Sequence, residues 1–214
     1  MESDVKNLNK TKFKGSAMLN PVPVVLISCK NKAGLQNVFT VGWIGTACTK
    51  PPMITVAIRK ERLSYEYIKD TMEFVVNIPS KHLVREVDFC GVRSGRSIDK
   101  IKECNFNMIP CDNISVDMIE SCPITLECKV KSITELGTHD LFLAEILSSY
   151  VDDTLIDEKG KIHFEKANLI TYAHGEYFEI KPNSLGSFGY SVMKKKTAKR
   201  KNSEKHKNKT SKHK

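Results

Sequence analysis

Two groups of cationic and hydroxyl side chains in this sequence could bind an anion. Residues 59–64 (RKERLS) place three cations before Ser64, a good N-cap for a following helix. The free amides and positive dipole of a helix N-terminus attract anions, and Arg59, Lys60 and Arg62 add charge. Ser94 and Lys100 offer a second set of donors. The two groups would suit a ligand charged at one end, although a solvated basic turn is the alternative for the first.

A third candidate segment surrounds Trp43, the only tryptophan of the chain. It lies between Gly42 and Gly45, and small residues follow it up to Thr49. Small residues leave backbone amides exposed, and glycine permits close approach by a flat ligand. The alternative is a core tryptophan beside a β-bulge. We interpret Cys48 in this segment as a small buried filler rather than a redox thiol.

Other catalytic patterns are absent from the sequence. There is no G-x-S-x-G nucleophile elbow, no H-E-x-x-H zinc helix and no Gly-rich dinucleotide loop. Residues 91–97 (GVRSGRS) have three residues between their glycines instead of the four of a phosphate loop, and an arginine where its lysine belongs. Hydrolytic and metal-dependent mechanisms are therefore disfavoured, and we predict no metal site.

Short β-branched and aromatic runs predict a mainly β protein. We expect strands at residues 22–29, 38–44, 53–58 and 74–78, and hairpins pairing 124–136 with 141–151 and 169–172 with 177–180. Short helices are predicted at 65–70, 81–89 and 98–103, with a loop at 91–96. Without regular βαβ alternation, this order favours an antiparallel β-barrel with a few short helices, or an α+β fold, over a doubly wound sheet.

The positive charge of the chain is concentrated at its C-terminal end. The 214 residues carry a formal net charge of +9, but residues 194–214 contain eleven Lys and Arg against one acid, so the rest is nearly neutral. We predict a folded domain at 1–190 and a disordered basic tail at 191–214, because the tail has too few apolar residues to form a core. A tail that contacts RNA, DNA or anionic lipid is the alternative to the solvated extension that we favour.

The cysteine spacing and the lengths of the apolar runs indicate in which cellular compartment the protein is expected. The seven cysteines form no C-x-x-C pair, so we interpret them as reduced thiols. We find no secretory signal and no apolar run long enough for a membrane span. A cytoplasmic protein without a membrane partner is the expectation.

Seven motifs in order resemble one known family. They are NVFTVGW at 37–43, PP at 51–52, RKERLS at 59–64, FVVNIP at 74–79, SGR at 94–96 with Asp99 and Lys100, CP at 122–123 with LEC at 126–128, and GTHDLF at 137–142. In order and spacing, they are similar to the flavin reductase-like family with the FMN-binding split barrel, and within it to the flavoredoxin type. The resemblance covers residues 17 to 177.

The resemblance implies a homodimer of split β-barrels of the Greek-key type, each binding one FMN near the subunit interface. It implies that Asn37 and Trp43 flank the isoalloxazine ring, that the backbone of residues 45–49 bonds the polar edge of the ring, and that His139 and Tyr172 lie near it. The phosphate would be held at the helix start and by the later loop. The complete set of implied cofactor-binding residues is Asn37, Trp43, Gly45, Thr46, Ala47, Cys48, Thr49, Arg59, Arg62, Ser64, Asn77, Ser94, Lys100, His139 and Tyr172.

The expected function is that of an FMN-dependent oxidoreductase, with no catalytic side chain because FMN carries the chemistry. Electrons would come from NAD(P)H or a redox partner protein and pass to flavin or another acceptor, either in an NAD(P)H:flavin reductase or in an electron carrier. Nicotinamide stacked on flavin needs no Rossmann fingerprint. The alternatives are a non-enzymatic barrel that binds nucleic acid through its basic tail, and a barrel in which Trp43, Ser64 and Lys100 are inert.

Overall fold

The computed structural model describes residues 9–193. Contacts divide the chain into a unit that ends at Ile180 and a second unit that begins at Lys181. The described part of the second unit, 181–193, contains one short 3-10 helix, η4 (Tyr190–Val192). From residue 194 onward, the predicted basic tail lies outside the described residues, and the predicted domain boundary at 190 stays a prediction.

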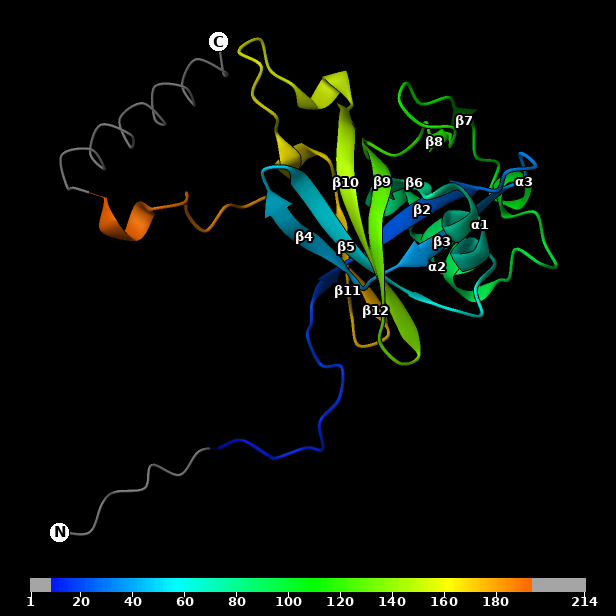
Figure 1. Ribbon diagram of the computed structural model, residues 1–214. Helices are drawn as coiled ribbons and strands as arrows, with labels where there is room; N and C mark the ends of the chain where they lie inside the picture. Colours follow the sequence, from blue (N-terminus) through cyan, green and yellow to red (C-terminus); the bar gives the residue numbers. More distant parts are fainter. Residues whose placement is uncertain (1–8, 194–214) are drawn as a thin grey trace. The chain divides into compact units, whose positions relative to one another are not determined.

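The first unit is built on a seven-stranded antiparallel sheet with the order β3-β2-β6-β9-β10-β5-β4 (Figure 1). Its strands are β2 (Val25–Lys30), β3 (Gln36–Val41), β4 (Ile44–Thr49), β5 (Pro52–Arg59), β6 (Glu73–Ile78), β9 (Ile124–Glu135) and β10 (His139–Val151). Two smaller sheets join β1 (Val22–Pro23) to β11 (Ile170–Ala173) and β12 (Glu176–Glu179), and β7 (Met108–Ile109) to β8 (Met118–Ile119).

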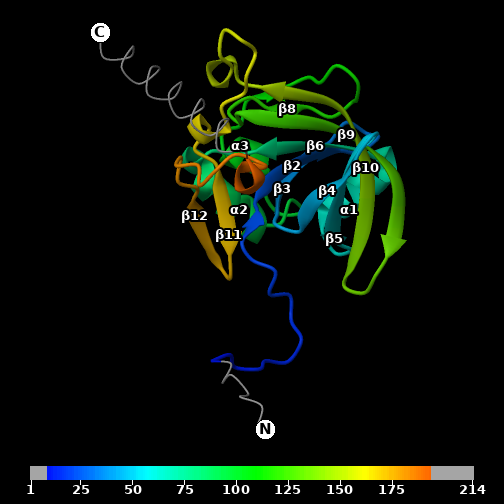
Figure 2. The same cartoon turned by 90° about the vertical axis from the view of Figure 1, so that its left-hand side faces the viewer.

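The chain connection between β3 and β4 forces the large sheet to curl. These strands are its two edges, yet only Gly42 and Trp43 join them. The three steps from Val41 to Ile44 span no more than about 11 Å, so the two edges must come close together at this end. Figure 2 shows the curved sheet from the side. Together with the antiparallel pairing, this gives the predicted β-barrel.

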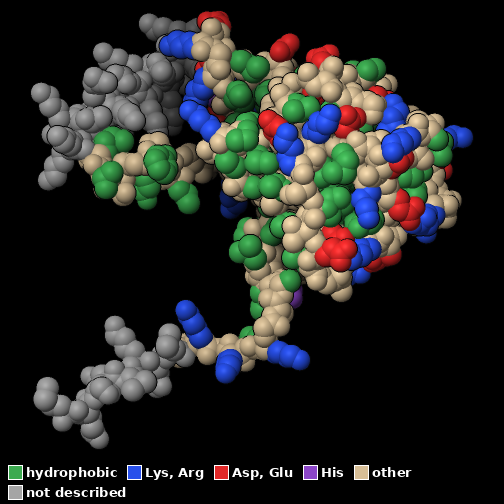
Figure 3. Space-filling model, viewed as in Figure 1, with side chains coloured by type: hydrophobic (Ala, Val, Ile, Leu, Met, Phe, Trp, Pro, Cys, Tyr) green, Lys and Arg blue, Asp and Glu red, His purple; other side chains and the backbone are tan. Residues whose placement is uncertain are grey.

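Alternating side chains of the strands fill the barrel. Along β5, Ile54, Val56 and Ile58 are buried while their neighbours are more exposed, as a half-buried strand requires. They pack with Phe74 and Phe142 in the main core. On the outer surface, charges of both signs are interspersed (Figure 3), in agreement with a nearly neutral barrel.

Three helices lie against the sheet. They are α1 (Leu63–Thr71), α2 (Val84–Val92) and the one-turn α3 (Lys100–Glu103), with 3-10 turns η1 (Lys81–Leu83), η2 (Asp153–Leu155) and η3 (Phe164–Lys166). Val87 and Cys90 of α2 pack against Leu26 and Val38, which point away from the barrel interior. The strands β2 and β3 are therefore buried on both faces. None of the helices within 9–193 is long and apolar enough to cross a membrane.

Three predictions about local structure were wrong in ways that affect the site. Ser64 is not the N-cap of α1: the cap position is Arg62, and the Ser64 hydroxyl accepts a hydrogen bond from Asn37 Nδ2 at 2.8 Å. The predicted strand 38–44 is two strands, because Gly42 and Trp43 turn the chain into β4. The loop after α2 begins at Arg93 rather than at Gly91, since the helix continues to Val92.

Candidate functional site

Two adjoining cavities lie where β3, α1 and α2 meet. The first, which we name the aromatic cavity, has a volume of about 430 Å³ and includes Trp43, His139, Tyr172 and Tyr177 in its lining. The second, the cationic cavity, has a volume of about 290 Å³, and its lining residues are Asn37, Phe39, Glu61, Arg62, Leu63, Ser64, Arg93, Ser94, Gly95 and Lys100. Phe39 and Arg62 line both cavities, so the two cavities are direct neighbours.

Trp43 and His139 form one aromatic pair of the first cavity. Their ring centroids are 4.4 Å apart and the planes are inclined by 41°. Trp43 occupies the two-residue turn between the edge strands and is half exposed, and its carbonyl accepts from the Ala57 amide at 2.9 Å. His139 is the first residue of β10 and pairs with Arg59 across the strands. The backbone therefore holds the two residues next to each other, while the Trp43 side chain stays half exposed.

Tyr172 and Tyr177 form a second aromatic pair in the same cavity. They face each other across the β11–β12 hairpin, with ring centroids 5.5 Å apart in an edge-to-face arrangement. The Tyr177 hydroxyl donates to Asp88 Oδ1 of α2 at 3.2 Å. This contact ties the small sheet to α2, so the cavity wall is assembled from segments far apart in the sequence.

The charge state of His139 follows from its surroundings. Partial burial and the nearby Arg59 guanidinium lower the pKa of His139 below its ordinary value of 6.5. The imidazole is therefore neutral at pH 7. Its Nδ1 lies 2.9 Å from the Thr138 hydroxyl. A neutral ring next to Trp43 offers a polar edge without adding charge to the aromatic cavity.

Lys100 dominates the chemistry of the cationic cavity. Only 3% of its surface is exposed, and its Nζ donates to the Cys90 carbonyl at 3.0 Å. Within the described chain, no Asp or Glu oxygen lies within 4.0 Å of this nitrogen. Burial lowers the pKa of Lys100, since a desolvated cation without an acidic partner is costly. An anion in this cavity would supply the missing partner.

The start of α1 adds further donors to the same cavity. Arg62 occupies the N-cap position, and no side chain caps the helix. The first amides of an uncapped helix are unpaired within it and carry partial positive charge. With Lys100 and Ser94, they give a donor set typical of phosphate sites.

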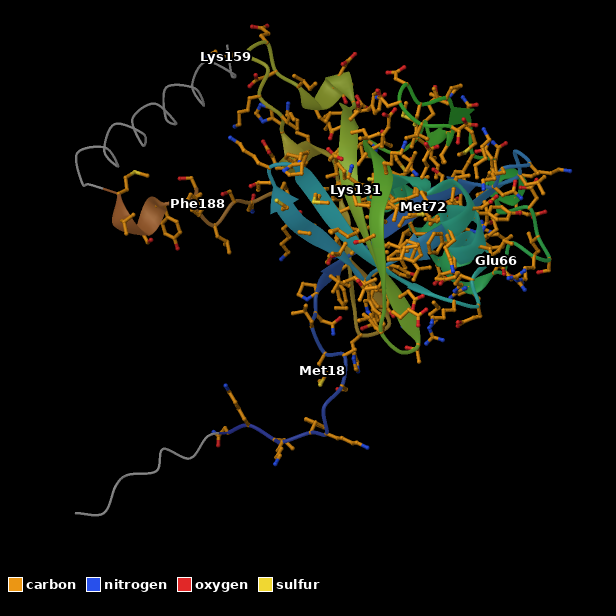
Figure 4. The ribbon with its side chains drawn as sticks, viewed as in Figure 1. Met18, Glu66, Met72, Lys131, Lys159 and Phe188 are labelled. Carbon is orange, nitrogen blue, oxygen red and sulfur yellow. The ribbon has the colours of Figure 1, made fainter. Side chains whose placement is uncertain are left out.

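The loop 93–97 approaches β3 closely at Gly95, beside the cationic cavity. A Cβ added to Gly95 would lie 2.3 Å from Asn37 Oδ1, closer than any side chain tolerates. Asn37 is 5% exposed, and its amide nitrogen is held by Ser64. On the outer side, Arg96 forms an ion pair with Glu66, which Figure 4 shows on α1. The loop 93–97 therefore lies against β3 through Gly95 and is joined to α1 through Arg96.

The structure brings together nine of the fifteen predicted site residues. Trp43, Arg59, Arg62, His139 and Tyr172 line the aromatic cavity, and Asn37, Arg62, Ser64, Ser94 and Lys100 line the cationic cavity. Lys60, which belongs to the same basic run, is in neither lining, because its amine forms ion pairs with Asp140 and Glu135.

The other six predicted residues lie elsewhere. Gly45, Thr46, Ala47, Cys48 and Thr49 are on the edge strand β4 and line neither cavity. Asn77 is fully buried, donates to the Leu26 carbonyl at 3.2 Å and accepts from the Ile119 amide at 2.8 Å. Its amide therefore links β6 to neighbouring segments of the core.

Sequence reasoning missed the part of the wall that α2 and the β11–β12 hairpin supply. Asp88, Gly91, Val92, Gly175 and Tyr177 line the aromatic cavity but were not predicted. Tyr177 could have been found, since the predicted hairpin places it directly opposite Tyr172. The described residues contain no group of three or more His, Cys, Asp or Glu arranged to hold a metal.

Comparisons with known proteins agree on the fold. The family model described as flavin reductase like domain matches residues 18–181. The flavoredoxin of Desulfovibrio vulgaris (Miyazaki F) superposes with a TM-score of 0.79 at 24% identity, covering 85% of this chain and 99% of that one. The flavoredoxin from Methanosarcina acetivorans gives 0.78 at 27% identity, covering 87% and 100%.

A sequence relative lies in an archaeon as well. An uncharacterised protein of Archaeoglobus fulgidus is 32% identical over 129 residues, which cover 60% of this chain and 73% of that protein.

Proposed function

The chain belongs to the flavin reductase-like family, and from this premise we propose that it is an FMN-dependent oxidoreductase. In this proposal, electrons come from NAD(P)H or a reduced partner protein and pass through FMN to a flavin or another acceptor. The family and the split-barrel fold are shown by the family match and the solved structures. The choice of FMN, the electron donor and the acceptor are proposals.

The observation that carries the proposal is the buried ammonium of Lys100, which has no acidic partner among the described residues and lines a cavity next to an aromatic one. FMN has a flat aromatic ring at one end and a phosphate at the other. The cationic cavity matches the phosphate in charge, and the aromatic cavity matches the ring in chemical character. The donor set of this chain therefore fits the cofactor.

Each residue has a defined role in this arrangement. Lys100, Arg62, Ser64 and Ser94 would hold the phosphate, while Trp43 and the other aromatic side chains would contact the ring. FMN, when bound, supplies reversible electron transfer that side chains cannot perform. The chain contributes orientation, exclusion of water and a positive potential from Arg59 and Arg62, which favours a reduced, anionic ring. No general base is required from the protein.

We further propose that the functional unit is a homodimer. The strand β4 is an edge of the large sheet, and its residues Gly45, Thr46, Ala47 and Thr49 are exposed next to the half-exposed Trp43. Unpaired edges and exposed aromatic side chains are features that proteins usually cover. Light scattering of the purified protein tests this directly: a molar mass of one chain contradicts the dimer.

The function is tested by the absorbance spectrum of purified protein, followed without oxygen as NADH or NADPH is added. A flavin spectrum that bleaches on the timescale of turnover supports the reductase. A flavin spectrum that bleaches only with a reduced redox protein supports the electron carrier. A colourless protein that takes up no added FMN would overturn the proposal and favour the nucleic-acid-binding alternative.

A further inference from the structure

Two cysteine side chains lie next to each other behind the cationic cavity. The sulfurs of Cys90 and Cys104 are 3.8 Å apart, and both are free thiols. Cys90 is buried in α2, whereas Cys104 follows α3 as its C-cap and is partly exposed. They are the ends of the segment 90–104, which carries Arg93, Ser94 and Gly95 of the cavity wall.

Lys100 is bonded to the backbone of both cysteines. Its Nζ donates to the Cys90 carbonyl at 3.0 Å, and the Cys104 amide donates to the Lys100 carbonyl at 3.0 Å. Any bond between the two sulfurs would therefore connect the same two backbone positions that hold this lysine. A change in the bonding of the two sulfurs therefore acts on the backbone groups that are hydrogen-bonded to Lys100 of the cationic cavity.

We propose that Cys90 and Cys104 are an oxidation site that forms a reversible disulfide, and that this bond locks the loop 93–99 and Lys100 in their anion-binding arrangement. The sulfurs must approach by about 1.8 Å to reach a disulfide length. Cys104 is the C-cap of a helix of a single turn and is partly exposed, so rotation of its side chain can supply that movement without displacing Lys100 at the start of the helix. The effect on FMN rests on the proposed function, whereas the disulfide itself does not.

The oxidation is balanced with hydrogen peroxide as the oxidant. The more exposed Cys104 sulfur attacks one peroxide oxygen, which gives a sulfenic acid and releases one water. The Cys90 sulfur then attacks the sulfenic sulfur, forming the S–S bond and releasing the second water. The thiol pair loses two electrons and two protons, and a small dithiol reverses the step by exchange.

Burial of the two thiols makes their oxidation slow. Burial raises the pKa of the Cys90 thiol to about 12 and raises that of Cys104 as well. The attacking thiolate is thus scarce at pH 7. The disulfide therefore forms only under sustained oxidation, and in a reducing compartment both cysteines stay as free thiols.

Peptide mapping of the full-length protein tests the disulfide. The protein is treated with hydrogen peroxide, free thiols are alkylated, and the digest is analysed by mass spectrometry. A linked peptide containing Cys90 and Cys104 is expected, and Cys104→Ser must abolish it. Cys111→Ser is the matched control, because Cys111 is also partly exposed but lines neither cavity. Alkylation of both cysteines after oxidation would overturn the inference.

FMN release provides the second readout. The dissociation rate should fall about fivefold or more on oxidation, and Cys104→Ser should lose this response while Cys111→Ser keeps it. An unchanged rate in protein shown to carry the disulfide would overturn the locking effect. If the protein takes up no FMN, the proposed function and the locking effect both fail, whereas peptide mapping still decides the disulfide.

Discussion

Replacement of Lys100 by methionine removes one charge from the site with little change in volume. The structure places the ammonium in the cationic cavity with 3% exposure and one carbonyl partner. If the phosphate of FMN pairs with this ammonium, Lys100→Met removes a charge-assisted hydrogen bond. It should leave the aromatic cavity unchanged, because Lys100 does not line it.

The size of the effect follows from the contact that is lost. A hydrogen bond to a charged group contributes about 1.5–3 kcal/mol, and each 1.4 kcal/mol is a factor of ten in affinity. Lys100→Met should therefore weaken FMN binding by about 10- to 150-fold. Riboflavin has the same ring but no phosphate, so its affinity should change by less than about threefold by the same reasoning.

Two controls separate the loss of an anion partner from damage to the fold. Lys102→Met removes the same charge from the exposed side of α3 and should leave FMN affinity within about twofold. The free energy of unfolding of Lys100→Met without ligand should not fall by more than about 1 kcal/mol, because a buried cation without an acid contributes little stability. Flavin fluorescence titration and urea unfolding measure these quantities.

The reasoning is refuted by either of two results. Equal weakening of FMN and riboflavin would show that Lys100 supports the shape of the site instead of binding phosphate. Unchanged FMN affinity would show that the phosphate lies elsewhere or that FMN is not the ligand.

Three further predictions follow from other contacts. Gly95→Ala should displace Asn37, whose Oδ1 lies 2.3 Å from the added Cβ, and weaken FMN about tenfold; unchanged affinity in titration would contradict this tight approach. Burial raises the pKa of Glu127, but the hydrogen bonds that it accepts outweigh burial and lower its pKa below 4.5. Its stabilisation is therefore present above pH 4.5 and lost as the pH falls through the folded pKa, and Glu127→Gln should flatten this acid limb of urea unfolding. The lowered pKa of His139 makes folding lose stability as the pH falls below 6.5, a loss that His139→Gln should remove and that a pH series of melting temperatures measures.

The elements that sequence predicted best are those whose signal is local. Alternating burial in β5 and the turn residues between β9 and β10 depend on neighbours a few positions away. Sequence also predicted several residues of the cationic cavity, because Lys100, Ser94 and Arg62 have the chemistry that an anion needs whatever the exact helix boundary. The order of motifs then predicted the family, which the family match confirmed.

The elements that sequence could not predict depend on contacts between distant segments. Ser64 has the residue type of an N-cap, but Asn37, 27 positions earlier, is bonded to its hydroxyl. The approach of Gly95 to the same asparagine, and that of Cys104 to Cys90, appear only once α2 and α3 lie on β3. Secondary-structure propensity cannot predict such contacts, because they depend on tertiary packing.

A buried charge explains how the two cavities keep a common geometry. Asp140 follows His139 in β10, is 1% exposed, and accepts from the Tyr65 hydroxyl of α1 at 2.7 Å. Its other oxygen lies 3.3 Å from Lys60 Nζ. The hairpin that carries a wall of the aromatic cavity is therefore bonded to the helix whose start forms the cationic cavity. Because a buried carboxylate that loses a hydrogen-bond donor is costly, this contact opposes separation of β10 from α1. The fold itself therefore sets the spacing between the aromatic cavity and the cationic cavity.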